Sequence, residues 1–175
     1  RQLRAWIDQG LDAPCVAINL STRQLRQPDL AVKVGRLLVA SGLSPDMLEF
    51  EVTETAAMEN PQTAARRLDE LGAMGLTLSI DDFGTGYSSL SHLRSLPLDA
   101  LKIDRSFVRD IASDANDLAI ARGTIALAHS LGLRVVAEGV ETMAQWQLLR
   151  GLGCDEVQGY LIACPAPAEE LAGIL

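Results

Sequence analysis

Short apolar runs along the chain repeatedly end on a polar side chain of a kind that can do chemistry. Longer segments with the helical spacing of apolar residues lie between them, several closed by glycine. The strand-like runs lead into Asn19, Glu51, Asp81 with Asp82, Lys102, Glu138 and Gln158. Predicted helices cover about 30–40, 61–74, 90–93, 117–131 and 142–149, with partial helices at 1–10 and from 168. Strands that alternate with helices through short connections predict a parallel α/β fold.

The polar ends of all six runs help to choose between two parallel α/β architectures. A doubly wound sheet concentrates its site near one switch point, whereas a βα barrel opens every strand end onto one mouth. The segment Gly84-Thr85-Gly86 has Ser89 in place of a third glycine, so the dinucleotide fingerprint is absent. We therefore expect a modified TIM-type βα barrel. Because such barrels have eight strands and about 250 residues, this chain is expected to supply about six strands and to lack about two on its N-terminal side.

Composition narrows the classes of function. The chain has 175 residues and a formal net charge of −8, which predicts one domain and argues against binding to DNA, RNA or an anionic membrane. No stretch is long and apolar enough to predict a membrane segment. Three cysteines without metal-type spacing favour buried free thiols in a reducing cytoplasm. Two histidines exclude a histidine-rich metal site, so any metal must use oxygen ligands.

Asp81 and Asp82 are the strongest single chemical signal. Adjacent carboxylates at the end of a buried strand repel each other and lose hydration unless a cation or hydrogen-bond donors compensate, which favours metal ligation. Glu51 is more ambiguous, because a half-buried strand with a solvated face would produce the same alternation. Lys102 is predicted to be a buried amine, serving either a structural ion pair or Schiff-base chemistry. Glu138 interrupts another apolar run.

Oxygen ligands of this kind suit Mg²⁺ or Mn²⁺. Two such ions can clamp an in-line displacement at phosphorus and supply hydroxide near neutral pH. Since divalent ions would reverse the local negative charge, phosphate diesters are the substrate class that best explains several acids beside one lysine. Enolase-type barrels are an alternative, with one metal and a carboxylate substrate.

Six segments together resemble the EAL-domain family of cyclic-di-GMP phosphodiesterases, from the first residues to about Pro167. They are Asn19-Leu20-Ser21, Glu51-Val52-Thr53-Glu54, Asp81-Asp82-Phe83-Gly84-Thr85-Gly86-Tyr87-Ser88-Ser89-Leu90, Lys102-Ile103-Asp104-Arg105-Ser106-Phe107-Val108, Ala137-Glu138-Gly139-Val140-Glu141-Thr142 and Gln158-Gly159-Tyr160. The resemblance implies a modified βα barrel with one strand antiparallel to the others. It also implies hydrolysis of cyclic di-GMP to linear pGpG with Mg²⁺ or Mn²⁺, in a site that holds two ions.

The resemblance also implies a role for each matching residue. The metal ligands would be Asn19, Glu51, Asp81 and Glu138, with Asp82 serving the second metal and anchoring its loop. Lys102 would hold or help activate the attacking water, so that the catalytic group comprises Lys102, Glu138, Asp81 and Asp82. Substrate binding and loop support would fall to Gln158, Glu54, Glu141, Gly84, Thr85 and Gly86. In this scheme Glu54 hydrogen-bonds the loop 83–89, which couples the metal site to dimerisation, and Glu141 supports Glu138.

One departure from the family pattern is large. The chain contains no strand with the Glu-Ala-Leu motif, and Glu169-Glu170-Leu171 in the last predicted helix is no substitute. We therefore expect residues 1–175 to be an N-terminally incomplete EAL domain, weakly active or inactive when isolated, from an active phosphodiesterase. The alternative is a non-catalytic cyclic-di-GMP receptor or dimerisation module. Expected partners are cyclic di-GMP and a second copy bound through the loop after Asp82. Attached GGDEF or sensory domains could tether this cytoplasmic bacterial domain to the inner membrane.

Overall fold

The computed structural model of the chain describes residues 1–86 and 90–173. Its elements follow in the order α1 (Gln2–Asp8), β1 (Val16–Asn19), α2 (Thr22–Leu25), α3 (Leu30–Ser41), η1 (Pro45–Met47), β2 (Leu48–Thr53), α4 (Glu54–Glu59), α5 (Pro61–Gly72), β3 (Thr77–Phe83), α6 (Leu90–Leu93), β4 (Ala100–Ile103), α7 (Arg105–Arg109), α8 (Ala115–Ser130), β5 (Arg134–Ala137), α9 (Met143–Leu152), β6 (Glu156–Val157) and α10 (Ala168–Leu171). None of the helices in these described ranges is long and apolar enough to cross a membrane.

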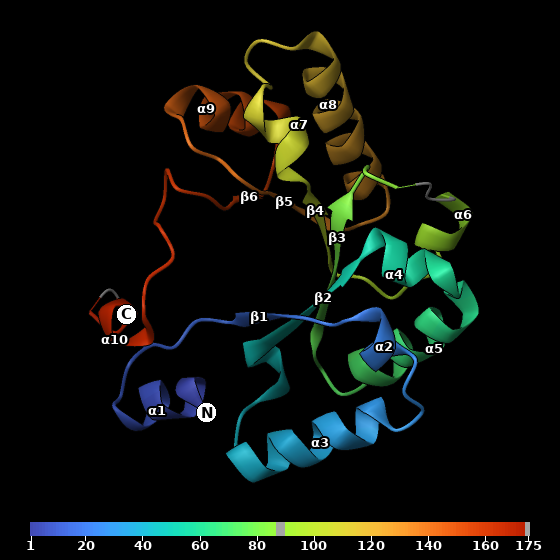
Figure 1. The fold of residues 1–175 in the computed structure, drawn as a ribbon, viewed down its shortest axis with the longest axis vertical. Helices are drawn as coiled ribbons and strands as arrows, with labels where there is room; N and C mark the ends of the chain where they lie inside the picture. Colours follow the sequence, from blue (N-terminus) through green and yellow to red (C-terminus); the bar gives the residue numbers. More distant parts are fainter. Residues whose placement is uncertain (87–89, 174–175) are drawn as a thin grey trace.

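The strands form one sheet whose spatial order, β1-β2-β3-β4-β5-β6, is the order of the sequence. Every neighbouring pair within the described residues is parallel, so the antiparallel strand implied by the resemblance is not among these six. The order contains no reversal and therefore no switch point of the doubly wound kind. Figure 1 shows the sheet curling, with helices around its outer side. The architecture is a curled half-barrel, as the barrel prediction requires.

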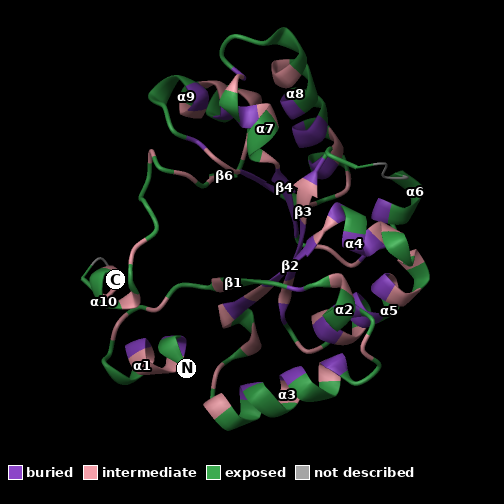
Figure 2. Ribbon diagram, viewed as in Figure 1, coloured by how far each residue is buried: buried purple, intermediate pink, exposed green. Residues whose placement is uncertain are grey.

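The two faces of the sheet differ sharply in polarity, and this difference produces the alternation seen in the sequence. Side chains facing the helices are apolar and buried, including Phe50, Val52, Leu78, Ile80, Leu101, Ile103 and Val135. The alternate positions face inward and carry the polar groups of the strands, among them Glu51, Asp81 and Lys102, because successive side chains on a strand point to opposite faces. Figure 2 shows the central strands largely buried and β1 mostly exposed.

Helix caps follow closely behind the strand ends. The side chain of Thr53, the last residue of β2, accepts a hydrogen bond from the N–H of Ala56 and so begins α4. Asp104 follows β4 directly and caps α7, while Ser21 and Thr142 each form a capping box with a glutamine three residues later. The ends of β1, β2, β4 and β5 are thus followed closely by a capped helix, which fixes the residues between strand and helix.

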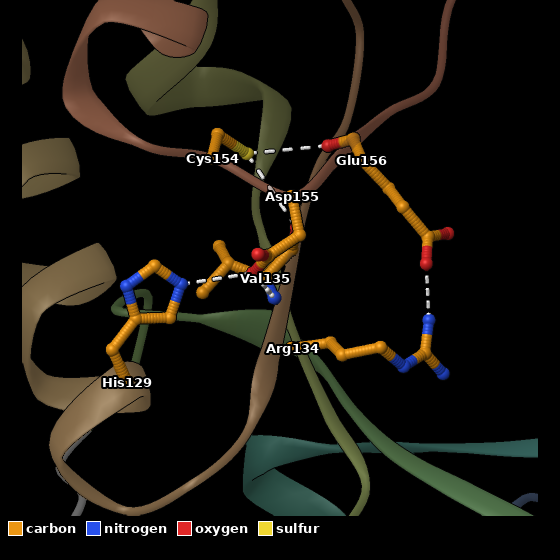
Figure 3. Close-up of polar contacts among 6 residues, drawn as sticks. All are labelled: His129, Arg134, Val135, Cys154, Asp155 and Glu156. Carbon is orange, nitrogen blue, oxygen red and sulfur yellow. Dashed lines mark hydrogen bonds and ion pairs between the residues drawn. The ribbon is translucent and has the colours of Figure 1, made fainter.

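A cluster of polar contacts joins α8, β5 and β6 at the amino ends of these two strands (Figure 3). Asp155 accepts a hydrogen bond from the N–H of Val135 at 2.8 Å and pairs with Nε2 of His129 at 2.9 Å. Arg134 and Glu156, the first residues of β5 and β6, form an exposed ion pair. These contacts lie at the end of the sheet away from the strand ends that carry the predicted site.

The cysteine prediction is only partly right. All three cysteines are free, but Cys15 and Cys164 are exposed and Cys154 is half-buried. Cys15 immediately precedes β1, an edge strand whose residues are largely exposed, so the apolar run around it does not bury it. Burial raises the pKa of the Cys154 thiol to about 11, and the thiol donates to the carbonyl of Glu156 at 3.2 Å. Cys154 is therefore a structural, unreactive thiol.

Candidate active site

Lys102 lies at the centre of the predicted site. It is 4% exposed on β4, and its ammonium contacts carboxylates from three other parts of the sheet. Nζ pairs closely with Glu51 of β2, lies 2.5 Å from Oε1 of Glu138 after β5, and lies 3.9 Å from Oδ1 of Asp81 on β3. The structure thus brings together four residues that are up to 87 positions apart in the sequence.

The protonation of Lys102 follows from these neighbours. Burial alone lowers the pKa of the ammonium, but hydrogen bonds to Glu138 and Glu51 and the charge of Asp81 outweigh it and raise the pKa above its ordinary value. The side chain is therefore a fixed positive charge near neutral pH. A Schiff-base nucleophile requires a neutral amine, so this geometry favours a charge-stabilising role over that alternative.

Glu138 carries a carboxyl whose pKa is raised. Burial raises this pKa most, and the neighbouring charges of Asp81 and Glu51 add to the effect, while the contact with Lys102 partly offsets it. Glu51 is 7% exposed, which removes the solvated-face interpretation of its alternating strand. Both carboxylates lie beside one ammonium, Glu51 buried and Glu138 partly exposed.

An irregularity in β3 explains why two aspartates stand side by side. Ile80 is in register with Leu101, but Phe83 is in register with Ile103, so Asp81 and Asp82 both lie opposite Lys102. This two-against-one arrangement is a β-bulge, a feature common next to active sites.

Asp82 adopts a left-handed backbone with φ of 55°, and its N–H donates to Oδ1 of Asp81 at 2.9 Å. Burial, followed by the charges of Asp81 and Asp104, raises the pKa of Asp82. Asp104 was not singled out from the sequence, although it follows the Lys102-Ile103 pair directly.

The two predicted amide residues lie on the edge strands. Asn19 ends β1 in register with Glu51, so the two residues occupy neighbouring positions on adjacent strands. Gln158 follows β6, where its N–H donates to the carbonyl of Ala137 at 2.8 Å and its own carbonyl accepts from Val140. Both amides are exposed, and they flank the carboxylate group on its two sides.

Glu54 connects the site to the loop after Asp82. It is the first residue of α4, is 2% exposed, and its Oε2 accepts a hydrogen bond from the N–H of Gly84 at 2.8 Å. A Cβ at Gly86 would lie 2.8 Å from Oε1 of Glu54, so a larger residue there would require the Glu54 carboxylate to shift. Thr85 turns the loop back by donating its hydroxyl to the carbonyl of Asp82 at 2.8 Å. The loop prediction for residues 87–89 lies outside the described residues.

Glu141 was predicted to support Glu138. Its side chain is exposed, and within the described residues no hydrogen bond joins the two glutamates. The N–H of Glu141 instead donates to Oε1 of Gln145, which also receives the N–H of Thr142. Gln145 is buried and donates to the carbonyl of Arg109, so it is the residue that braces this segment.

The donor set fits a divalent cation. No three His, Cys, Asp or Glu side chains in 1–86 and 90–173 form a ready-made metal-binding group, and the ammonium of Lys102 lies among the carboxylates of the site. One ammonium against the three carboxylates that contact it leaves a formal charge of −2 in a buried place. A single divalent ion would neutralise that charge, and carboxylate and amide oxygens are the ligands that Mg²⁺ and Mn²⁺ prefer.

Comparison with known proteins agrees with this arrangement. The EAL domain family model matches residues 1–165. The chain is 46% identical over 171 residues to the bifunctional diguanylate cyclase/cyclic di-GMP phosphodiesterase MucR of Pseudomonas aeruginosa, covering 98% of the chain and 25% of MucR. It spans about a quarter or less of the length of the curated relatives that it matches.

Solved structures give the same result. The PaMucR phosphodiesterase in complex with c-di-GMP superposes with a TM-score of 0.92 at 46% identity, covering 97% of this chain and 69% of that one. The EAL domain of Mycobacterium smegmatis DcpA superposes with a TM-score of 0.94 at 39% identity, covering 99% and 78%. The manganese and cyclic di-GMP complex of Klebsiella pneumoniae BlrP1 has a TM-score of 0.80 at 38% identity, covering 90% and 41%. With the family model matching nearly its whole length, the chain belongs to the EAL domain family.

Proposed function

We propose that the full-length protein hydrolyses cyclic di-GMP to linear pGpG in a site that holds two Mg²⁺ or Mn²⁺ ions. One observation carries the proposal: a buried lysine lies among three strand-end carboxylates, beside a bulge that adds a fourth. Relatives named as cyclic-di-GMP phosphodiesterases support the substrate, and the BlrP1 complex supports a divalent metal.

The residues that would hold the metal are Asn19, Glu51, Asp81, Asp82 and Glu138. The bound ions would polarise the phosphodiester and lower the pKa of water. Gln158 would complete the pocket on the side of β6. Glu54 would hold the start of the loop after Asp82 against the site through the N–H of Gly84.

The residues of the chain then divide the work of hydrolysis. Lys102 keeps its proton, so it orients the attacking water and stabilises the negative charge that develops on the phosphoryl oxygens. Glu138, whose carboxylate contacts Lys102, would take the proton that this water releases. The water oxygen bonds to phosphorus, one phosphorus–oxygen ester bond breaks, and the departing ribose oxygen gains a proton. Opening one of the two diester links of the ring leaves linear pGpG.

Partners and location are part of the same proposal. MucR is named as a bifunctional protein and is about four times longer than this chain, which supports attached GGDEF or sensory domains. The family resemblance implies a homodimer that forms through the loop after Asp82, and the hydrogen bond from Gly84 to Glu54 would connect that loop to the site. Free thiols suit the bacterial cytoplasm, and domains outside this chain could tether the protein to the inner membrane.

The test is turnover by the purified full-length protein. Incubation of cyclic di-GMP with Mn²⁺ or Mg²⁺, followed by anion-exchange chromatography, is expected to yield linear pGpG. Asp81→Asn and Lys102→Ala are each expected to lower kcat about a hundred-fold or more. Glu156→Gln, at the far end of the sheet, is the matched control and is expected to keep the parent rate. Tight binding of cyclic di-GMP without any product would instead establish the receptor alternative.

A further inference from the structure

Ser79 is a buried polar residue that the proposed chemistry does not use. It lies in the middle of β3 with none of its surface exposed. Among the described residues its hydroxyl has no hydrogen-bond partner. Buried hydroxyls are nearly always paired, because an unpaired one loses its bonds to water and gains nothing in return. The unpaired hydroxyl therefore requires an explanation.

The register of the sheet places Ser79 on the inner face, beneath the candidate site. Ser79 is two residues before Asp81 on the same strand, so both side chains point to the same face. It is also in register with Glu51 of β2 on one side and Ala100 of β4 on the other. Because β3 runs between β2 and β4, the ion pair from Glu51 to Lys102 crosses over β3 beside Ser79.

Glu51 supplies the acceptor that this hydroxyl lacks. Its carboxylate is buried, and within 1–86 and 90–173 the donor that contacts it is Lys102. An ionised carboxylate can accept about four hydrogen bonds, so most of its capacity is unused. An unpaired donor and an under-bonded acceptor thus occupy neighbouring positions on adjacent strands, while the ammonium draws the carboxylate towards β4.

We infer that Ser79 is a positioning residue for Glu51 in the metal-loaded site. When a divalent cation takes the place of the ammonium beside Glu51, the hydroxyl of Ser79 donates to that carboxylate and holds it in its ligating orientation. Groups that hydrogen-bond a metal ligand in this way commonly change metal affinity ten-fold or more. This inference rests on the proposed metal-dependent function.

The test compares Ser79→Ala with the parent in the full-length protein, using calorimetric titration with Mn²⁺ and thermal unfolding with and without Mn²⁺. Ser79→Ala is expected to bind Mn²⁺ about ten-fold more weakly. Its metal-free Tm is expected to equal or exceed that of the parent, because the variant no longer buries an unpaired hydroxyl. A residue that served stability alone would not give these opposite effects.

Two further variants separate the hydroxyl from its surroundings. Thr77→Ala removes a hydroxyl from the same face of β3 at the position in register with Glu49, away from the site, and is expected to bind Mn²⁺ like the parent. Ser79→Thr keeps the hydroxyl and is expected to restore most of the affinity. Equal Mn²⁺ affinity in the parent and Ser79→Ala, or equal losses in Ser79→Ala and Thr77→Ala, would overturn the inference alone. A parent that binds no Mn²⁺ would overturn the proposed function and this inference together.

Discussion

Replacing Lys102 with methionine tests the charge balance of the site in depth. Methionine keeps most of the length of the side chain but leaves Glu51, Asp81 and Glu138 without the cation that they contact. Removing one partner from a buried ion pair costs about 3–5 kcal/mol, and Lys102 is buried enough for that range to apply without a reduction for solvent screening. For a domain of this size the metal-free Tm is then expected to fall by roughly 10 °C.

Lower pH and added Mn²⁺ are each expected to reduce this loss of thermal stability. The pKa of Glu138 is already raised by burial, and the variant removes the Lys102 contact that lowers it, so the cost is present above the unfolded pKa and is relieved as pH falls through the folded one. The difference between Lys102→Met and the parent is therefore expected to shrink between pH 8 and pH 5. Added Mn²⁺ is expected to raise the Tm of the variant at least as much as that of the parent, while turnover stays lost.

The matched control is Arg134→Met, which removes a cation from the same face of the sheet at its amino end. Arg134 pairs with Glu156, but its side chain is 44% exposed, so this loss is expected to stay below about 1 kcal/mol. Differential scanning calorimetry at pH 8 and pH 5 measures all three proteins. A metal-free Lys102→Met protein as stable as the parent would refute the claim that the ammonium compensates buried carboxylates.

Three other substitutions test the structure away from Lys102. Burial raises the pKa of Asp155, but the hydrogen bonds from His129 and Val135 outweigh it, so the pKa is lowered overall. The stabilisation from these bonds is therefore present above the unfolded pKa near 4 and is lost as pH falls through the folded pKa. Asp155→Asn is expected to lower the urea midpoint at pH 7 and to match the parent below about pH 3; a constant difference at both pH values would contradict this. Gly159→Ala would place a Cβ 2.3 Å from the backbone of Val140, so its free energy of unfolding in urea is expected to fall by about 3 kcal/mol. Unchanged stability would count against this close packing. Gly151 lies inside α9 with open space around it, so Gly151→Ala is expected to raise the free energy of unfolding by about 0.5–1 kcal/mol in the same assay. A loss of stability would show a contact that the structure lacks.

The strands and their ends could be predicted because the pattern that marks them is local. The residues that end the six apolar runs all lie at the last residue of a strand or within two residues of it. The long helices were also predicted to within a few residues, since their apolar spacing and closing glycines are sequence signals. Helices α2, α4 and α7 were missed, because four to six residues are too few to show a periodic pattern.

Other features depend on contacts between strands and could not be predicted from one stretch of sequence. The bulge that sets Asp81 and Asp82 opposite Lys102 extends β3 to Phe83, beyond the expected end at Asp81. In the sequence, Ser79 is a polar residue within an apolar run, and only its register with Glu51 places it beneath the site. Cys15 was expected to be buried, but its place beside an edge strand exposes it.

Anomalous diffraction from crystals of the full-length protein with Mn²⁺ and cyclic di-GMP tests the central claim most directly. Two manganese peaks are expected in this site, at least one of them about 2 Å from carboxylate oxygens of Asp81 and its neighbours Glu51 and Glu138, with Lys102 displaced from at least one of these carboxylates. A manganese peak elsewhere in a protein that still hydrolyses cyclic di-GMP, or turnover with no bound metal, would contradict it.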